Sequence, residues 1–520
     1  MRWQKCGERF VHVAIRADAS PTIGTGHIVR CRTLAEDLKA RGVELTLICA
    51  KPTGTAMHLF AEAGFTVESN NVKAIDAGAP HDQVKDVQNT IKIVSDIKPD
   101  WLIVDHYGLD KQFEQKLRPF VKNILVVDDL FNRSHDCDVL VNPSVIYDRA
   151  ASASYMKLVP QDCRIFIGPR YAPLRTRYRS VTKRSVTSVE RVLVFFGGVD
   201  SLNLTTTSLR ALSLGELADI YVDVVVGVDN PHFDEIMNLA NERERTKVFS
   251  DLPHLAHVMS SADIAIGAGG ATTWERMCCG LPSIVVSIAD NQTEIAEQLS
   301  QQNLLVYAGL GEKIFVDQLA KLISDVVNDR VLRAELAERG RSTVDGYGAL
   351  RLAEIVCPSH SSQLRIRPAK ETDISVVFGW SNDPETRSQS LRSESVNWAD
   401  HVAWYSSVLM DHKRFLFILE IGDLPVGQVR FDTVGHGQLK LSYGLDRIVR
   451  GRGWGQHLLE LGIAQIAQKG DFQIMAEVKE SNPASIRSLE RIKFLCESQT
   501  ESGIRRYIRL VERKVPDSQS

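Results

Sequence analysis

The amino-acid sequence predicts an α/β protein in which two Rossmann-like domains are followed by an α+β domain. Short apolar runs alternate with helix-like segments from residue 11 to about residue 142, and the same alternation begins again at residue 191. This alternation is typical of parallel sheets covered by helices on both faces. Beyond residue 363, apolar runs follow one another closely, as strands of a mixed sheet do: 415–421, 426–431 and 439–445.

The chain of 520 residues is too long for one ordinary core. We expect the first Rossmann-like domain over residues 1–180 and the second over 181–355. Residues 357–362 are small and polar and include a proline, which indicates a linker that we assign to 356–363. The third domain then spans residues 364–514.

The composition excludes several classes of protein. The formal net charge of −3 gives no reason to expect nucleic acid or an acidic membrane as a partner. The nine cysteines are scattered without a C-x-x-C pair, so we expect no metal site and a reducing environment. We find no run long enough to cross a bilayer and no signal sequence. We therefore expect a soluble cytoplasmic protein that acts on small molecules, with an oligomeric state that is not predicted.

The first helix of the chain opens with Gly24-Thr25-Gly26-His27, directly after an apolar run. A helix N-terminus presents unpaired backbone N–H groups and disfavours a cationic imidazole, so His27 is a candidate general base beside an anion site. A purely structural strand–turn–helix is the alternative. Val29 occupies the third glycine position of the dinucleotide fingerprint, and no acid follows the run 45–49, which argues against NAD.

Ligands bind at the carboxyl ends of parallel strands, so the residues after each run are candidates. In the second domain, the run 264–266 leads into Gly267-Ala268-Gly269-Gly270-Ala271-Thr272-Thr273-Trp274-Glu275. Its glycines, hydroxyls and helix N-terminus favour a diphosphate site, with Glu275 accepting from a ribose diol. Glu275 as a first-turn acid on the helix dipole is the alternative. Asn291 and Gln292 either bind phosphate or sugar hydroxyls or form a solvent-facing helix start.

Five ordered motifs within residues 10–350 resemble the UDP-sugar hydrolases of pseudaminic acid biosynthesis, in the glycosyltransferase-B fold group: residues 24–31, 104–108, 168–175, 196–200, and 269–275 with 291–292. The resemblance implies that water displaces UDP from UDP-2,4-diacetamido-2,4,6-trideoxy-β-L-altrose without a metal. It implies His27 as the base, Asp18 as its orienting partner and Tyr107 as a further catalytic residue. The substrate-binding residues that we expect are Gly26, His106, Arg175, Gly198, Gly269, Gly270, Thr272, Glu275, Asn291 and Gln292.

A paired-carboxylate glycosidase is a different way to cleave an anomeric bond. Asp128 and Asp129 are adjacent carboxylates after the run 124–127. Neighbouring residues at a strand end point in opposite directions, so we do not expect them to act as a catalytic pair.

The third domain carries a glycine-rich loop between a strand and a helix, at residues 450–455. Consecutive N–H groups, a helix N-terminus and arginines suit a pyrophosphate, although a basic turn is the structural alternative. The loop resembles the R/Q-x-x-G-x-G/A motif of Gcn5-related N-acetyltransferases, which implies acetyl-CoA as co-substrate. The cofactor-binding residues that we expect are Arg450, Gly451, Arg452, Gly453, Trp454, Gly455, Asn482 and Ser485. Leu489 stands where many members have the tyrosine that protonates the thiolate.

Further residues of the third domain resemble the branch that acetylates the 4-amino group of a UDP-sugar: Asn382, Asp383, Pro384, Arg387, Trp398, His401 and Trp404. Acetyl transfer requires a base, because an ammonium cannot attack a thioester, and Glu477 and Tyr443 are candidates. The aromatic residues can equally belong to the core. We thus predict a bifunctional enzyme. The alternative is a UDP-sugar-dependent glycosyltransferase with a module that only binds acetyl-CoA or acylates something else.

Overall fold

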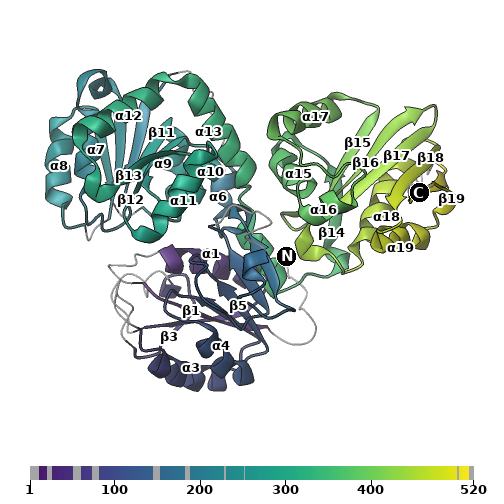
Figure 1. Cartoon of the computed structure of the whole chain (residues 1–520), viewed down its shortest axis with the longest axis horizontal. Coiled ribbons are helices and arrows are strands. Elements are labelled where there is room, and N and C mark those ends of the chain that lie inside the picture. The colour runs from purple at the N-terminus through teal and green to yellow at the C-terminus, as the bar shows by residue number, and fades with distance from the viewer. Residues whose placement is uncertain are drawn as a thin grey trace, which may run out of the picture. The chain divides into compact units, whose positions relative to one another are not determined.

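A computed structural model describes residues 11–19, 26–50, 60–72, 81–144, 153–181, 188–227, 230–250, 252–500 and 503–513. The chain divides into two compact units, Met1–Cys357 and Pro358–Ser520 (Figure 1). Gly24 and Thr25 of the predicted loop lie outside the described residues.

The first unit begins with a parallel sheet of seven strands in the order β3-β2-β1-β4-β5-β6-β7. Its strands are β1 (His12–Ala17), β2 (Glu44–Cys49), β3 (Thr66–Ser69), β4 (Trp101–Asp105), β5 (Asn123–Val127), β6 (Val139–Asn142) and β7 (Arg164–Ile167). Its helices include α1 (Gly26–Ala40), α3 (Gln83–Ile97) and α4 (Lys111–Leu117), followed by the 3₁₀ turns η1 (Arg118–Phe120) and η2 (Pro169–Tyr171) and by α6 (Thr176–Arg179).

A second parallel sheet has six strands in the order β10-β9-β8-β11-β12-β13. They are β8 (Arg191–Phe195), β9 (Tyr221–Val226), β10 (Thr246–Ser250), β11 (Ile264–Ala268), β12 (Ser283–Ser287) and β13 (Val306–Leu310). The helices α7 (Leu204–Leu212), α8 (Phe233–Glu242), α9 (Ala256–Ser261), α10 (Thr272–Cys279), α11 (Asp290–Gln301), α12 (Val316–Asn328) and α13 (Arg330–Thr343) accompany it. Apolar side chains on both faces of this sheet are buried, as expected for parallel strands.

The last helix of this unit, α14 (Gly348–Val356), returns to the first sheet. Arg41, just beyond α1, donates to Glu354 at 2.6 Å and to the carbonyl of Cys357 at 3.0 Å. A Cβ at Gly348 would lie 2.0 Å from the carbonyl oxygen of Ala172, so only glycine allows this approach. The chain segment after the second sheet therefore completes the first domain.

The second unit has a mixed sheet in the order β14-β15-β16-β17-β18-β20-β19. Its strands are β14 (Leu364–Pro368), β15 (Arg414–Ile421), β16 (Leu424–Gly435), β17 (Gln438–Leu445), β18 (Phe472–Lys479), β19 (Leu495–Gln499) and β20 (Ile504–Val511). Its helices are α15 (Ile374–Ser381), α16 (Pro384–Gln389), α17 (Trp398–Met410), α18 (Trp454–Ala467) and α19 (Pro483–Arg491). The parallel ladder between β17 and β18 ends at the pair Leu441 and Ala476, although both strands run further.

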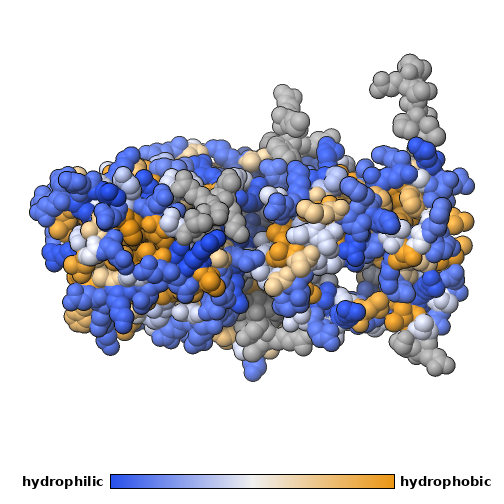
Figure 2. Space-filling model, turned by 90° about the horizontal axis from the view of Figure 1, so that it is seen from above, coloured by the Kyte–Doolittle hydropathy of each residue, from blue (hydrophilic) through white to orange (hydrophobic). Residues whose placement is uncertain are grey.

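The predicted fold class, two Rossmann-like sheets followed by an α+β domain, is confirmed. The face in Figure 2 is mostly hydrophilic, with smaller apolar groups among the polar residues. Among the residues that the structure describes, no helix is both long enough and apolar enough to span a bilayer.

Candidate active sites

His27 lies in the first turn of α1, and its Nδ1 is 2.5 Å from Oδ1 of Asp105, the last residue of β4. Arg30 donates to the same carboxylate from Nε and Nη2, at 2.5 Å each. Burial alone would raise the pKa of Asp105, but Arg30 and His27 together outweigh it and hold that pKa well below its usual range. An ionised carboxylate only accepts hydrogen bonds, so Nδ1 carries the hydrogen and Nε2 is the basic nitrogen of His27.

Asp18 is not the hydrogen-bond partner of His27, contrary to what the resemblance implies. Its carboxylate pairs with Arg16 and accepts from the backbone N of Ala50 at 2.7 Å and from Nε2 of His106 at 3.0 Å. In the sheet, Ala17 pairs with Asp105, so the carboxylate beside His27 comes from β4 rather than from the end of β1. Asp105 belongs to the motif 104–108, but its role as the partner of His27 was not predicted.

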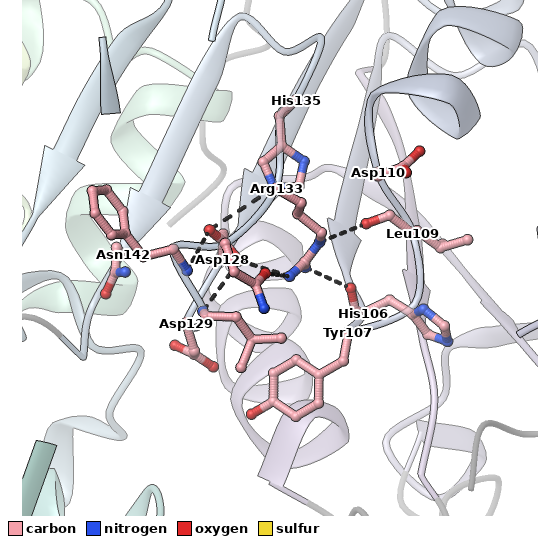
Figure 3. A network of polar contacts seen from close by, with 12 residues as sticks. His106, Tyr107, Leu109, Asp110, Asp128, Asp129, Arg133, His135 and Asn142 are labelled. Atoms are coloured by element: carbon pink, nitrogen blue, oxygen red, sulfur yellow. Dashed lines mark hydrogen bonds and ion pairs between the residues drawn. The ribbon is translucent and has the colours of Figure 1, made fainter. Parts of the chain in front are cut away.

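The neighbours His106 and Tyr107 point apart (Figure 3). His106 is directed at Asp18, and burial lowers its pKa to about 4, so the ring is neutral at neutral pH. Tyr107 faces His27 edge-on, with ring centroids 4.4 Å apart. Tyr107, predicted as a catalytic residue, therefore contacts His27 with its side chain, whereas the predicted substrate-binding residue His106 faces Asp18.

The adjacent carboxylates of Asp128 and Asp129 bind different partners. Asp129 accepts from Nη1 of Arg30 at 2.7 Å and from the hydroxyl of Ser144 at 2.8 Å. Asp128 is fully buried and lies 3.1 Å from Nη1 of Arg133. Arg30 thus joins Asp129 to the carboxylate that holds His27, a link that no sequence pattern indicated.

The second sheet contributes side chains to the same place. Asn291, in the first turn of α11, donates from Nδ2 to the hydroxyl of Tyr107 at 3.3 Å. A Cβ at Gly26 would lie 4.0 Å from Cβ of Ala271, in the loop that leads into α10. The structure therefore brings together the predicted residues Gly26, His27, Tyr107 and Asn291.

Arg276 holds the loop between β11 and α10 through hydrogen bonds. This buried guanidinium donates to the carbonyl of Ala268 at 2.8 Å and to the hydroxyl of Thr273 at 3.0 Å. Gln292 packs on the loop, because a Cβ at Gly269 would meet its Cβ at 3.2 Å. Gly269, Gly270, Thr272 and Gln292 are thus neighbours around one helix N-terminus, which can bind an anion.

Glu275 lies one turn inside α10 and is half-buried. Burial raises its pKa to about 7, although hydrogen bonding to Tyr178 and the charges of Arg276 and Arg175 oppose this. Arg175 donates to the carbonyl of Pro253 at 2.7 Å and, with Glu36 and residues near both, lines a polar hollow of about 250 Å³. A carboxyl with this pKa is ready to accept two hydroxyl hydrogens at slightly alkaline pH.

The Gly197–Gly198 turn follows β8, and the backbone at Gly227 lies very close to it. A Cβ at Gly227 would lie 2.1 Å from the carbonyl oxygen of Gly198. Asp200, just beyond, accepts from the backbone N of Leu204 at 3.0 Å and of Thr205 at 2.8 Å. Gly198 therefore sits in a turn whose shape is fixed on both sides.

In the second unit, the loop before α18 is open at its glycines. Gly451 and Gly453 have φ of +80° and +78°, and an added Cβ at either would meet no atom within 4 Å. Arg452 lies over the ring of Trp454, which is buried, and a Cβ at Gly455 would lie 3.3 Å from Oγ of Ser488. Backbone N–H groups and the start of α18 are therefore the part of this loop that can bind an anion.

The side chain of Arg450 binds the protein rather than facing outward from the loop. It donates to Glu385 at 2.8 Å, to the hydroxyl of Thr386 at 2.9 Å and to the carbonyl of Leu445 at 3.1 Å, and pairs with Asp383 at 2.7 Å. Arg450 is among the residues expected to bind the cofactor, and in this structure its guanidinium is bound by protein groups. Arg450 thereby fixes α16 against the loop.

Asn482 caps α19 by accepting from the backbone N of Ser485 at 3.1 Å. Leu489 is completely buried and has no acidic hydrogen to donate to a thiolate. Burial raises the pKa of Tyr443, whose ring lies 3.8 Å from a Cβ added at Gly455. Glu477 is ion-paired with Lys440 at 2.6 Å, which leaves Tyr443 as the candidate nearer to the loop.

The aromatic residues of α17 form a packed cluster. The ring of His401 lies between 5.2 and 5.9 Å from those of Phe378, Trp398, Trp404 and Tyr405, and its Nε2 bonds to the carbonyl of Ile374 at 3.0 Å. Burial lowers the pKa of His401. Asn382 and Asp383 support local backbone, and Arg387 approaches the carbonyls of Arg392 and Glu394. Membership of the core, the alternative weighed above, accounts for His401.

Two family models match the chain. Residues 191–345 match the glycosyltransferase family 28 C-terminal domain, and residues 363–495 match the acetyltransferase (GNAT) domain. An uncharacterized protein of Methanocaldococcus jannaschii is 23% identical over 93% of this chain and 96% of its own length. The spore coat polysaccharide biosynthesis protein SpsG of Bacillus subtilis is 26% identical over 66% of this chain and 98% of its own length.

The UDP-2,4-diacetamido-2,4,6-trideoxy-β-L-altropyranose hydrolase of Campylobacter jejuni is 23% identical over 56% of this chain and 96% of its own length. The chain resembles UDP-sugar hydrolases in its first part and acetyltransferases in its second. Both resemblances drawn from the motifs are thereby confirmed.

Proposed function

We propose that the first unit hydrolyses UDP-2,4-diacetamido-2,4,6-trideoxy-β-L-altrose to UDP and the free sugar, with His27 as general base. The observation that carries the proposal is the buried pair of His27 and Asp105, which lies beside Tyr107 and Asn291. The sequence similarity to a hydrolase named for this substrate supports the same assignment.

Each part of the reaction has a residue suited to it. Nε2 of His27 removes a proton from water as the water oxygen bonds to the anomeric carbon, and the bond from that carbon to the UDP oxygen breaks. Asp105 stabilises the imidazolium formed, because it already accepts from Nδ1. UDP departs with the electron pair, and its diphosphate is stabilised by backbone N–H groups of Gly269, Gly270 and Thr272.

The remaining predicted residues bind the substrate. Glu275 accepts from the ribose hydroxyls, and Asn291 and Tyr107 contact the sugar. Gln292 lies in the first turn of α11, which follows β12, and Gly198 lies in the turn that follows β8; a nucleotide-sugar would lie at these carboxyl ends of the strands. We expect the reaction to need no metal, so UDP release should survive an excess of EDTA.

We further propose that the second unit transfers an acetyl group from acetyl-CoA to the 4-amino group of the precursor UDP-sugar. The residues present fit the cofactor. The open glycines of the loop, the N-terminus of α18 and the end of the ladder between β17 and β18 leave backbone groups for a pyrophosphate and a pantetheine arm. Bound acetyl-CoA would supply the activated thioester. Gly451, Gly453 and Asn482 would hold it, and Tyr443 is the nearby candidate for proton transfer.

The decisive experiment incubates the full chain with the UDP-diacetamido sugar alone, in ¹⁸O water. We expect stoichiometric UDP and one ¹⁸O atom in the released sugar. UDP release that strictly requires a sugar acceptor would instead identify a glycosyltransferase, the function favoured by the family 28 match.

A second incubation, with the UDP-4-amino sugar and acetyl-CoA, tests the transferase through release of free CoA thiol. Binding of acetyl-CoA without thiol release would make the second unit a binding module.

A further inference from the structure

Arg133 joins the loop that follows β4 to the loop that follows β5 (Figure 3). It donates from Nε to the carbonyl of Leu109 at 2.8 Å and from Nη2 to the carbonyl of His106 at 3.0 Å. Its Nη1 lies 3.1 Å from Oδ1 of Asp128. A single planar guanidinium therefore binds two backbone carbonyls on one side and a carboxylate on the other.

Asp128 holds its own loop in a strained shape. Its carboxylate accepts from the backbone N of Leu130 at 3.2 Å and of Phe131 at 3.1 Å, and from the hydroxyl of Tyr155 at 3.1 Å. Phe131 has φ of +56°, a conformation that costs a residue with a side chain of order 1–3 kcal/mol unless its surroundings impose it. The Asp128 end of the link is therefore rigid and completely buried.

The two loops carry one residue that contacts His27, Tyr107, and one that is linked to it through other side chains, Asp129. Tyr107 lies between the carbonyls of His106 and Leu109 that Arg133 binds, and its ring packs edge-on against His27. Asp129 follows Asp128, and reaches His27 through Arg30 and Asp105. The contacts thus form a closed ring, in which Arg133 connects the Tyr107 loop to Asp128 without touching the imidazole.

We propose that Arg133 is a positioning residue for the hydrolysis of the UDP-sugar. It acts through Tyr107 and Asp129, by fixing the two loops relative to each other and to His27. This inference rests on the proposed function of the first unit. Misplacing a reacting group by about 1 Å can cost about 10²-fold in rate, which is the scale of effect that loss of such a link produces.

The test compares Arg133→Gln with Arg118→Gln in the full chain. Arg118 is the matched control because it also bridges carboxylates of the first domain, Asp136 at 3.0 Å and Asp138 at 2.6 Å, but contacts none of the loop residues above. For Arg133→Gln we expect kcat for UDP release to fall about 10- to 100-fold with KM changed less than about threefold. Arg118→Gln should keep kcat. Arg133→Lys should recover only part of the loss, because an ammonium cannot reproduce the planar fork.

Two further measurements test whether Arg133 acts through Tyr107. In a Tyr107→Ala background, Arg133→Gln should lower kcat by a smaller factor than in the wild type, since the two residues act together. Fully additive losses, or an equal fall in Arg118→Gln, would overturn the proposal. Thermal melting of both glutamine variants shows whether they fold.

If the wild type releases no UDP, the proposed function fails and amide hydrogen exchange tests the link itself. Arg133→Gln should then exchange faster than the wild type in segments 106–110 and 128–132, while Arg118→Gln should not. Unchanged exchange in those two segments would overturn the inference.

Discussion

The helix N-termini of α1 and α18, the two proposed sites, would bind a ligand in two different ways. At α1 the proposed reactive group is a side chain: His27 is buried, bonds to Asp105 and belongs to the closed ring of contacts. At α18 the proposed binding group is the backbone: Gly451 and Gly453 are left-handed and open, and the nearby guanidinium of Arg450 is turned into the protein. A side-chain site depends on the residues that bond to the reactive side chain. A backbone site depends on the absence of side chains that would fill the space in front of its N–H groups.

Removing the side chain of His27 should have the largest effect on the proposed side-chain site. We expect His27→Ala to lower kcat for UDP release by about 10²–10⁴-fold, because the proton acceptor is lost. Binding of UDP, measured by calorimetry, should stay within about threefold, since the nucleotide residues lie on α10 and α11. Near-normal turnover would remove His27 as the base.

A side-chain site should also lose activity when the partner of the base, Asp105, is changed and His27 itself is kept. Asp105→Asn should lower kcat for UDP release by about 10²-fold, because an amide no longer fixes the Nδ1–H tautomer or stabilises the imidazolium. Arg30 would keep Asp129 but lose the fully buried carboxylate of Asp105, so we expect a lower melting temperature. Asp18→Asn provides the comparison, as Asp18 does not contact His27: its effect on kcat should be at least tenfold smaller.

A backbone site should be sensitive to added bulk instead. Gly453→Val should raise KM for acetyl-CoA about tenfold, because a β-branched residue at φ of +78° is strained and its side chain would fill the open space beside the proposed cofactor loop. Gly503→Val is the control, since Gly503 has φ of +72° and open space, but lies in the turn between β19 and β20. Equal effects of the two changes on KM would place the cofactor elsewhere.

The start of α10 offers both backbone N–H groups and a side chain, Glu275, to the proposed ligand. The change that we expect there is the smallest of the set. The pKa of Glu275 is about 7, so its carboxylate, the form that accepts ribose hydroxyls, increases from pH 6 to pH 8. We expect UDP affinity to rise by up to about tenfold over this range in the wild type, beyond any rise in Glu275→Gln. Calorimetry of both proteins at the two pH values measures the difference, and parallel curves would remove Glu275 from the ribose site.

The same residue affects stability in the opposite direction. Its folded-state pKa lies above the ordinary value of 4.5, so its contribution to stability is complete below that pH and is lost as the pH rises through about 7. The wild type should therefore melt lower relative to Glu275→Gln at pH 8 than at pH 5.

The sequence was sufficient to predict what depends on local pattern. Alternating apolar runs identified the parallel sheets, and the glycines before α10 and α18 identified two helix N-termini. These features follow from residue types within a few positions of one another. Predicting them therefore does not require the order of the strands in a sheet.

The partners of His27 and Arg450 could not be predicted in that way. Asp105 reaches His27 only because β4 lies beside β1 in the strand order, with Asp105 opposite Ala17. Arg450 matches a motif, yet carboxylates on α16, more than sixty residues earlier, bind its guanidinium. Which charged groups meet is decided by long-range topology, which a short motif does not encode.

The contact between Arg41 and the end of α14 determines where this chain can be cut. Glu354 is fully buried and accepts from Arg41, and Gly348 presses against the backbone of Ala172. A fragment that stops after the second sheet would expose the apolar side of α1 and leave Arg41 without its carboxylate. Genetic separation of the two units therefore has its natural breakpoint after Cys357, where a fragment of the first unit keeps the contact between Arg41 and Glu354.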